Sequence, residues 1–227
     1  MRLFFGSRKE EGDQIEIKLN IGCGPSGQFH GYINIDNSPS VLLGKFPRIK
    51  KVLFKLGAIK ENQYEANWSG VFRCDVTKGI PYGSSTVDKI YSSHMLEHIN
   101  HDNGLFFIKE CYRVLKPGGV LRLVVPDLLW YAEKYVERTQ KVIGSKELPD
   151  DRTAHDDFLN TIYGAYLKKR RYGAEHYFMY DLPTLVFVLK AAGFENIKKY
   201  AFKIGSDMEL AFFDSRPEES LYMEGIK

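Results

Sequence analysis

A glycine-rich turn between two short apolar strands constrains the fold of this chain more than any other feature. Residues 15–36 read IEIKLNIGCGPSGQFHGYINID, so an alternating apolar stretch leads into the turn and a second strand ends at Asp36. Glycines let the backbone approach a ligand closely, because a Cβ would clash or forbid the required dihedral angles. A carboxylate at the end of the next strand can accept both hydroxyl groups of a ribose. The segment therefore predicts a site for a ligand that carries a nucleoside.

Strand and helix signals alternate through the first 126 residues. A helix with one apolar side is expected over 103–115, and the sequence KPGG at 116–119 is expected to end it with a left-handed glycine cap. Apolar runs predict five strands, at 15–21, 32–36, 71–74, 87–92 and 120–125. This alternation predicts an α/β fold with a doubly wound, mostly parallel sheet.

The second half of the chain completes that sheet after an interruption. A helix over 182–192 is expected to begin at an Asp181 cap and to end at Gly193. Two further strands, near 197–203 and 221–226, bring the expected total to seven. We interpret residues 1–227 as a single domain and residues 128–180 as a helical insertion or lid within it.

Residues 40–58 mix apolar and basic side chains at roughly helical spacing, with Pro47 as a break. We expect this segment to form a helix that packs beside the sheet. Contact with a membrane surface is the alternative, because the segment is both basic and amphipathic.

Polar side chains follow four of the predicted strands. They are Asp36, Asp75, Ser93 and Asp127. Because parallel sheets of this type bind ligands at the carboxyl ends of their strands, we expect these four side chains to converge on one edge.

The composition argues against a nucleic-acid-binding protein and against an integral membrane protein. The formal net charge of +3 is too small to indicate a nucleic-acid partner. No apolar run approaches the ~20 residues of a membrane helix, so no integral membrane segment is expected. Three scattered cysteines favour a reduced, cytoplasmic protein.

Four segments in order resemble the class I S-adenosylmethionine-dependent methyltransferases. They are LNIGCGPSG at 19–27, INID at 33–36, CDVTKGIPYGSSTVDKIYSSHMLEHI at 74–99 and VLKPGGVLRLVVPD at 114–127. The closest likeness is to compact predicted methyltransferases often linked to surface-polysaccharide clusters, an association that holds only at the level of the family. The resemblance implies a Rossmann-like methyltransferase fold and S-adenosylmethionine as cofactor.

The resemblance also implies a role for individual residues. Gly22, Cys23 and Gly24 would lie under the methionine and ribose parts of the cofactor. Asp36 would hold the ribose hydroxyls, and Asp75 would accept from the adenine amino group. The remaining cofactor contacts would come from Val76 on the adenine ring, Ser93 beside the sulfonium and Asn20 at the methionine amino group.

The chain departs from the family pattern in two places. Asn20 stands where the family usually has an acid, so it would bind the amino group without charge assistance. Only seven residues separate Gly24 from Tyr32, too few for the usual helix after the first strand. Because Glu16 and Lys18 also interrupt that strand, we infer that one sheet face there lacks its helix. We expect the amino-terminal arm or a second subunit of a homodimer to cover it.

Two other motifs offer alternative interpretations. Gly22 to Gly27 matches the dinucleotide fingerprint GxGxxG, which requires a helix that opens at the third glycine. His94 to His98, HMLEH, matches the HxxEH signature of zinc hydrolases, in which two histidines on a helix bind the metal and Glu97 acts as base. A glycine turn with a purely structural role also remains open.

The favoured interpretation is methyl transfer to a small-molecule or carbohydrate acceptor, with no metal. His94 and His176 are the candidate bases if the acceptor is a hydroxyl group. The second interpretation is a protein that binds S-adenosylmethionine or its product without catalysis. Asn20 and the missing helix leave room for that alternative.

Overall fold

The computed structural model describes residues 15–143, 155, 158, 159, 162 and 176–227. In chain order its elements are β1 (Lys18–Ile21), β2 (Ile33–Asp36), α1 (Ser40–Gly44), α2 (Pro47–Lys55), α3 (Glu61–Glu65), β3 (Val71–Arg73), η1 (Val76–Lys78), β4 (Val87–Ser93), η2 (Leu96–His98), α4 (His101–Val114), β5 (Leu115–Pro126), α5 (Leu128–Ile143), α7 (Leu182–Ala192), β6 (Asn196–Tyr200), α8 (Met208–Phe212) and β7 (Ser220–Ile226). Among these helices, none is long and apolar enough to cross a membrane.

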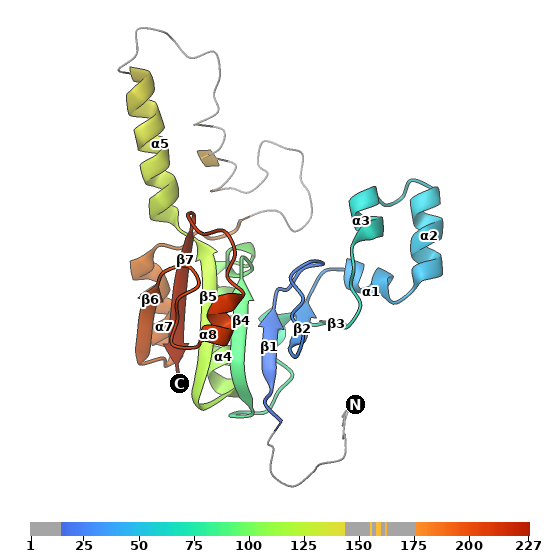
Figure 1. The fold of residues 1–227 in the computed structure, drawn as a ribbon, viewed down its shortest axis with the longest axis horizontal. Helices are drawn as coiled ribbons and strands as arrows, with labels where there is room; N and C mark the ends of the chain where they lie inside the picture. The colour runs from blue at the N-terminus through green and yellow to red at the C-terminus, as the bar shows by residue number, and fades with distance from the viewer. Residues whose placement is uncertain (1–14, 144–154, 156–157, 160–161, 163–175) are drawn as a thin grey trace.

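Within the described residues, seven strands form one sheet in the order β3-β2-β1-β4-β5-β7-β6 (Figure 1). Strands β1 to β5 pair in parallel, whereas β7 runs antiparallel to both β5 and β6. The strand order reverses between β1 and β4, and doubly wound sheets bind ligands outside the carboxyl ends of strands at such a point. The predicted mostly parallel, seven-stranded sheet is confirmed.

Helices α4 and α7 cover one face of the sheet. The Asn100 side chain caps α4 by accepting from Asn103 N, and α4 buries Phe107 and Cys111 in the main apolar core. The Asp181 side chain accepts from Thr184 N, and α7 ends at Gly193 in the left-handed conformation. The predicted limits of α7 are therefore confirmed.

The prediction for the end of α4 is wrong. The helix ends at Val114, and Leu115 already has extended dihedral angles. Leu115 is fully buried and pairs with Val87 as the first residue of β5, so strand pairing and burial end the helix before the glycines. Gly118 does have a positive φ of 80°, but it lies inside the span of β5 and caps nothing.

The connection between β1 and β2 contains turns and no helix, as its length predicts. The Phe29 ring from this connection stacks on Phe213 at a centroid distance of 3.7 Å. Tyr32 and Tyr91 join the same aromatic cluster on the face opposite α4. Side chains of the short connection therefore take part in the packing that a helix would otherwise provide.

Helix α8 packs on that face through Leu210, and its acids pair with lysines of β1 and β4. Lys18 Nζ lies 2.7 Å from a Glu209 carboxylate oxygen, and Lys89 Nζ lies 2.7 Å from Asp207 and 2.8 Å from Glu209. The charge in β1 is thus paired with acids of α8 and its cap. The homodimer stays a prediction, and the amino-terminal arm lies outside the described residues.

A buried charge network fixes the connection between β6 and α8 to the same face. The Arg122 guanidinium in β5 is fully buried and donates to Asp214 at 2.8 and 2.5 Å and to Glu224 at 2.6 Å. The two carboxylates also accept backbone N–H groups, Asp214 from Lys203 and Glu224 from Ser206. One arginine therefore neutralises and positions two buried acids from different segments.

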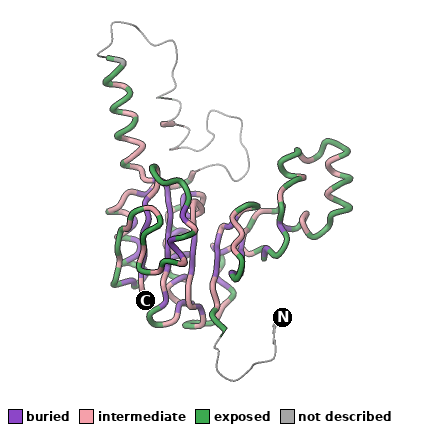
Figure 2. The backbone as a smooth tube through the Cα atoms, viewed as in Figure 1, coloured by how far each residue is buried: buried purple, intermediate pink, exposed green. Residues whose placement is uncertain are grey.

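The expectation that residues 40–58 pack beside the sheet is confirmed only for α1, which contacts β3 and buries Val41 against Val71. Helix α2 contacts α1 and α3 and has no buried residue. Ile49, Val52 and Leu56 are 52, 55 and 75% exposed, and Figure 2 shows the α1–α3 segment as a largely exposed projection. Its amphipathic pattern is therefore not explained by packing against the sheet.

The predicted insertion at 128–180 lies partly outside the described residues. Helix α5 fills its first 16 residues and rises from the end of β5 (Figure 1). The insertion returns at Tyr180, whose carbonyl accepts from Leu128 N at 2.9 Å. The two ends of the segment therefore meet at the carboxyl edge of the sheet, and its interpretation as an insertion stays a prediction.

Candidate functional site

The glycine turn after β1 presents open space at Gly24 and a packed contact at Gly22. Both residues have a positive φ, of 60° and 76°. A Cβ on Gly22 would lie 2.4 Å from Met95 Cγ, so glycine there lets the β4–α4 connection lie on the turn. A Cβ on Gly24 would meet no atom within 4 Å. The free space of the turn is therefore at its second glycine.

Asp36 is bound to this turn from the end of β2. Its Oδ2 accepts from Gly24 N at 2.9 Å, and its Oδ1 accepts from Ser38 N at 2.7 Å. Each carboxylate oxygen has a further lone pair, so both can still accept hydroxyl groups. The predicted ribose contact thus fits the geometry, and Asp36 also orders the turn that would hold the ligand.

Asn20 tethers the connection between β1 and β2. Its side chain is buried, and Nδ2 donates to Gly27 O at 2.6 Å and to Asn34 Oδ1 at 2.8 Å. Asn34 in turn donates to Phe29 O and accepts from Phe29 N. Both N–H groups of Asn20 are therefore used inside the protein, and only its carbonyl oxygen remains for the predicted contact with an amino group.

Replacing Asn20 with aspartate should destabilise the protein, although an acid is the usual residue of the family at this place. A carboxylate would face the acceptor oxygens of Gly27 and Asn34, and both hydrogen bonds would be lost. An unsatisfied buried polar group costs about 1–3 kcal/mol, and a charged one costs more. Urea unfolding should show a loss of at least that size. Asn62→Asp, an exposed position in α3, should change stability by less than about 0.5 kcal/mol; equal losses in both variants would refute this role of Asn20.

Cys23 contributes to the candidate site through its backbone alone. The thiol packs with Val41, Trp68 and Val71 in a small core cluster. Burial, together with the nearby Asp36 charge, raises the pKa of Cys23 to about 12. The thiol therefore stays protonated and unreactive at neutral pH.

Asp75 and Val76 follow β3, where an adenine contact is predicted. The Asp75 carboxylate accepts from Thr77 Oγ1 at 2.6 Å and lies 3.0 Å from Lys78 Nζ. The hydrogen bond from Thr77 is the main cause that lowers the pKa of Asp75. Val76 is 7% exposed within the main core, so little of its side chain is available to a ring. Both adenine contacts remain predictions.

Ser93 ends β4, and His94 follows it in a left-handed conformation with φ of 49°. The His94 ring is held on both sides: Nε2 lies 3.1 Å from Ser220 Oγ, and Nδ1 lies 3.3 Å from an Arg216 nitrogen. A non-glycine residue in this conformation is strained and is enriched at functional sites. In this backbone conformation the imidazole lies beside Ser220, the first residue of β7, and does not continue the direction of β4.

Glu97 enters the sequence analysis only as the base of the HxxEH alternative, and the structure places it in this site. It is 1% exposed, and its Oε1 lies 3.4 Å from His94 Nδ1 and 3.9 Å from His98 Nε2. Residues 94–98 form a turn and the 3₁₀ segment η2 rather than an α-helix. The helical arrangement that the HxxEH signature requires is therefore absent, and Glu97 lies between two histidines as their common partner.

His176 lies beside this group from the other end of the insertion. Its ring centroid is 5.1 Å from that of His98. The segment is fixed there because Glu97 O accepts from Tyr177 N at 2.8 Å and from Phe178 N at 3.3 Å. The structure therefore connects the two predicted bases, His94 and His176, through Glu97 and His98. The buried acid in LEH was the available signal, but its second histidine lies 78 residues away in the sequence.

Asp127 has a local role. Its carboxylate accepts from Leu129 N at 3.0 Å in the first turn of α5. The structure therefore shows Asp127 as the cap of α5.

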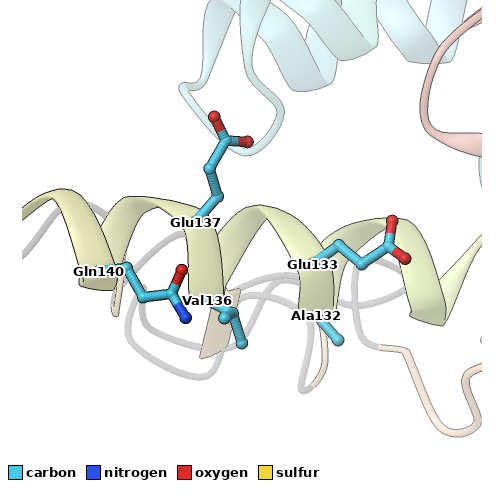
Figure 3. Close-up of a pocket in the computed structure, with 5 residues that line it drawn as sticks. All are labelled: Ala132, Glu133, Val136, Glu137 and Gln140. Atoms are coloured by element: carbon cyan, nitrogen blue, oxygen red, sulfur yellow. The ribbon is translucent and has the colours of Figure 1, made fainter.

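The hollow along α5 does not indicate a functional site. Figure 3 shows its lining residues, Ala132, Glu133, Val136, Glu137 and Gln140. All five come from one helix, so no second described element supplies a group that converges with them.

Comparisons with known proteins identify the family of part of the chain. A family model for a methyltransferase domain matches residues 19–123, from β1 into β5. No curated protein matches the sequence. Similar solved structures include a SAM-dependent methyltransferase from Archaeoglobus fulgidus, at 15% identity over 93% of this chain and 86% of that chain, with a TM-score of 0.49. An S-adenosylmethionine-dependent methyltransferase from Mesorhizobium loti is similar at 19% identity over 95% and 93% of the two chains, with a TM-score of 0.48.

Proposed function

We propose that this chain, whose residues 19–123 form a methyltransferase domain of the class I S-adenosylmethionine-dependent family, transfers a methyl group to a small-molecule or sugar-bearing acceptor. The observation that carries the proposal is the open space at Gly24 above a turn that Asp36 holds. S-adenosylmethionine is the methyl donor. The acceptor class rests on the resemblance and on the absence of a strongly basic composition.

The cofactor contacts follow from the turn and the strand ends. Asp36 would accept the ribose hydroxyls, and Gly24 would leave room for the ligand. Ser93 ends β4 on the neighbouring side of the strand-order reversal, where the sulfonium is expected. Asp75 and Val76 would lie at the adenine, and Asn20 Oδ1 at the methionine amino group.

Methyl transfer to a hydroxyl group needs alignment and a base. Holding the oxygen and the methyl group in line can contribute up to ~7–11 kcal/mol. His94 is the first candidate base because Ser220, Arg216 and Glu97 fix its ring. His176 is the second, since it lies on the return of the insertion that would cover the acceptor.

The alternatives lose support on specific observations. A dinucleotide site needs a helix that opens at Gly27, and residues 22–32 form none. Asn20 has a structural role, and the short connection after β1 is packed through Phe29 on Phe213, so neither departure from the family pattern requires an inactive protein.

Replacing Gly24 with alanine should weaken S-adenosylmethionine binding at least tenfold, because the new methyl group would enter the open space of the turn. Gly31→Ala is a matched control: Gly31 has a φ of 80°, and its Cβ would also meet nothing within 4 Å. Both variants should lose about 1–2 kcal/mol of stability from left-handed strain. Only Gly24→Ala should lose affinity in calorimetric titrations with S-adenosylmethionine and S-adenosylhomocysteine.

A thermal-shift assay gives the scale of the wild-type effect. A ligand at 100 times its dissociation constant adds ~2.7 kcal/mol. At about 2–4 °C per kcal/mol, that corresponds to a rise of roughly 5–11 °C in Tm. A rise of this size with NAD and none with either sulfur ligand would overturn the proposed function, as would equal affinity losses in the two glycine variants.

A further inference from the structure

Three potential metal ligands meet beside the end of β4. One ligand atom from each of Glu97, His98 and His176 can be chosen so that all three lie within 4.8 Å of one another. They come from two segments that are far apart in the sequence, and backbone hydrogen bonds to Glu97 O hold these segments together. Glu97 and His98 are neighbours in the sequence, and the fold completes the cluster with His176.

The buried carboxylate supplies the second observation. Glu97 is 1% exposed, and its Oε2 has no hydrogen-bond partner among the described residues. A charged oxygen in such a place is costly unless a cation or donor compensates it. The hydroxyl group of Tyr180, also buried without a described partner, is close enough for the Glu97 charge to contribute, after burial, to raising the pKa of Tyr180. Unmet polar groups therefore gather around this carboxylate.

The types of the three ligands indicate which metals they could bind. Two imidazoles and one carboxylate are the ligand types of zinc and of neighbouring first-row divalent metals. Three protein ligands leave at least one coordination position open, which is typical of catalytic rather than structural sites. Bonds of ~2.0–2.2 Å place ligand atoms about 3.4 Å apart, so binding would draw the three side chains together by roughly 1 Å.

We propose that Glu97, His98 and His176 bind one divalent transition-metal ion, with zinc as its representative. This site differs from the HxxEH arrangement, because His94 is not a ligand and the second histidine comes from the end of the insertion. It also differs from the metal-free site that the sequence favours. The binding site itself does not depend on the proposed function.

A catalytic role for the metal does rest on the proposed function. The open position would take the oxygen of the acceptor hydroxyl, and the hydroxyl proton would leave to solvent. The oxygen lone pair would form the new bond to the methyl carbon. The electrons of the breaking carbon–sulfur bond would stay on sulfur, which gives S-adenosylhomocysteine and the methyl ether.

Cobalt(II) and zinc titrations of protein freed of metal by chelation test the binding site, without cofactor. Cobalt(II) gives visible absorption bands that report its ligands, and equilibrium dialysis with elemental analysis gives the stoichiometry. We expect one ion per chain in the wild type and at least tenfold weaker binding in Glu97→Gln and His176→Ala. His101→Ala is the control: His101 contacts Phe178 at a ring distance of 4.8 Å but is not in the cluster, and it should bind as the wild type does.

The outcomes separate the two proposals. No stoichiometric ion in the wild type, or wild-type binding in His176→Ala, would overturn the metal site. Far-UV circular dichroism and S-adenosylmethionine titration of each variant show whether it is folded and able to bind cofactor. If chelated protein binds S-adenosylmethionine and transfers methyl groups at the full rate, the catalytic role is refuted. If the wild-type protein does not bind S-adenosylmethionine, the proposed function is refuted, whereas the metal-binding result still holds.

Discussion

Replacing His94 with alanine should lower the rate constant of methyl transfer to a hydroxyl acceptor by about 10²–10⁴-fold, the usual contribution of a positioned base. The imidazole is held by Ser220 and Arg216 and lies 3.4 Å from the buried Glu97 carboxylate. An Arg216 N–H donating to Nδ1 favours the tautomer in which Nε2 carries the proton and donates to Ser220. A proton arriving at Nδ1 would instead be stabilised by Glu97. The ring therefore has partners for both the state before and the state after proton transfer.

The measurement is a single-turnover assay with S-adenosylmethionine labelled in the methyl group and a screen of hydroxyl-bearing acceptors. Affinity for S-adenosylmethionine should stay within about threefold of the wild type, because no cofactor contact is removed. His176→Ala should lose a similar factor in rate, and His101→Ala should lose little. Unchanged rates in both the His94 and His176 variants, with cofactor binding intact, would eliminate both histidines as bases. Metal content separates their roles, since only His176→Ala should lose a bound ion.

Arg122→Leu should destabilise the protein by about 3–5 kcal/mol, the cost of removing one partner from a buried ion pair. The Asp214 and Glu224 carboxylates would stay buried without their counter-charge. At about 2–4 °C per kcal/mol, Tm should fall by roughly 6–20 °C. The loss should exceed that of an ordinary surface substitution several-fold.

Lys116→Met is the matched control for this variant. It also removes one positive charge paired with a carboxylate, Asp88 at 2.6 Å, but the pair is partly exposed. Such pairs contribute about 0–1 kcal/mol. A loss in Arg122→Leu no larger than that in Lys116→Met would show that the network contributes little to stability. A variant that also replaces Asp214 and Glu224 with leucine should recover only part of the loss, because the N–H groups of Lys203 and Ser206 would be left without acceptors.

The sheet and the glycine turn could be predicted because their signals are local. Alternating apolar residues mark the strands, and the seven residues between Gly24 and Tyr32 exclude a helix on length alone. Asp181 and Gly193 fixed both ends of α7 for the same reason. The end of α4 failed as a prediction, since the glycine signal is local but Leu115 is drawn into β5 by pairing with Val87.

Features that depend on distant residues could not be predicted. A lysine at position 18 is unexpected in a buried strand, and only the fold shows that it is paired with Glu209. From the sequence, Asn20 is expected to bind the cofactor amino group less strongly than an acid would. The structure shows that its amide instead donates to Gly27 and Asn34. The sequence places Glu97 in a recognisable LEH segment, but nothing nearby indicates that His176 will lie next to it. Each case involves a polar side chain whose partner is set by the fold.

The ion pair between β1 and α8 has a consequence for folding during synthesis. Lys18 and Glu209 are 191 residues apart in the chain. At ~5–20 residues per second of synthesis, roughly 10–40 s separate their appearance. Until then the polar side of β1 and the aromatic rings beside it have no cover, and closing such a long loop is slow. The connection that carries the glycine turn is therefore among the first parts translated, but its packing against Phe213 forms only after almost the whole chain has been made.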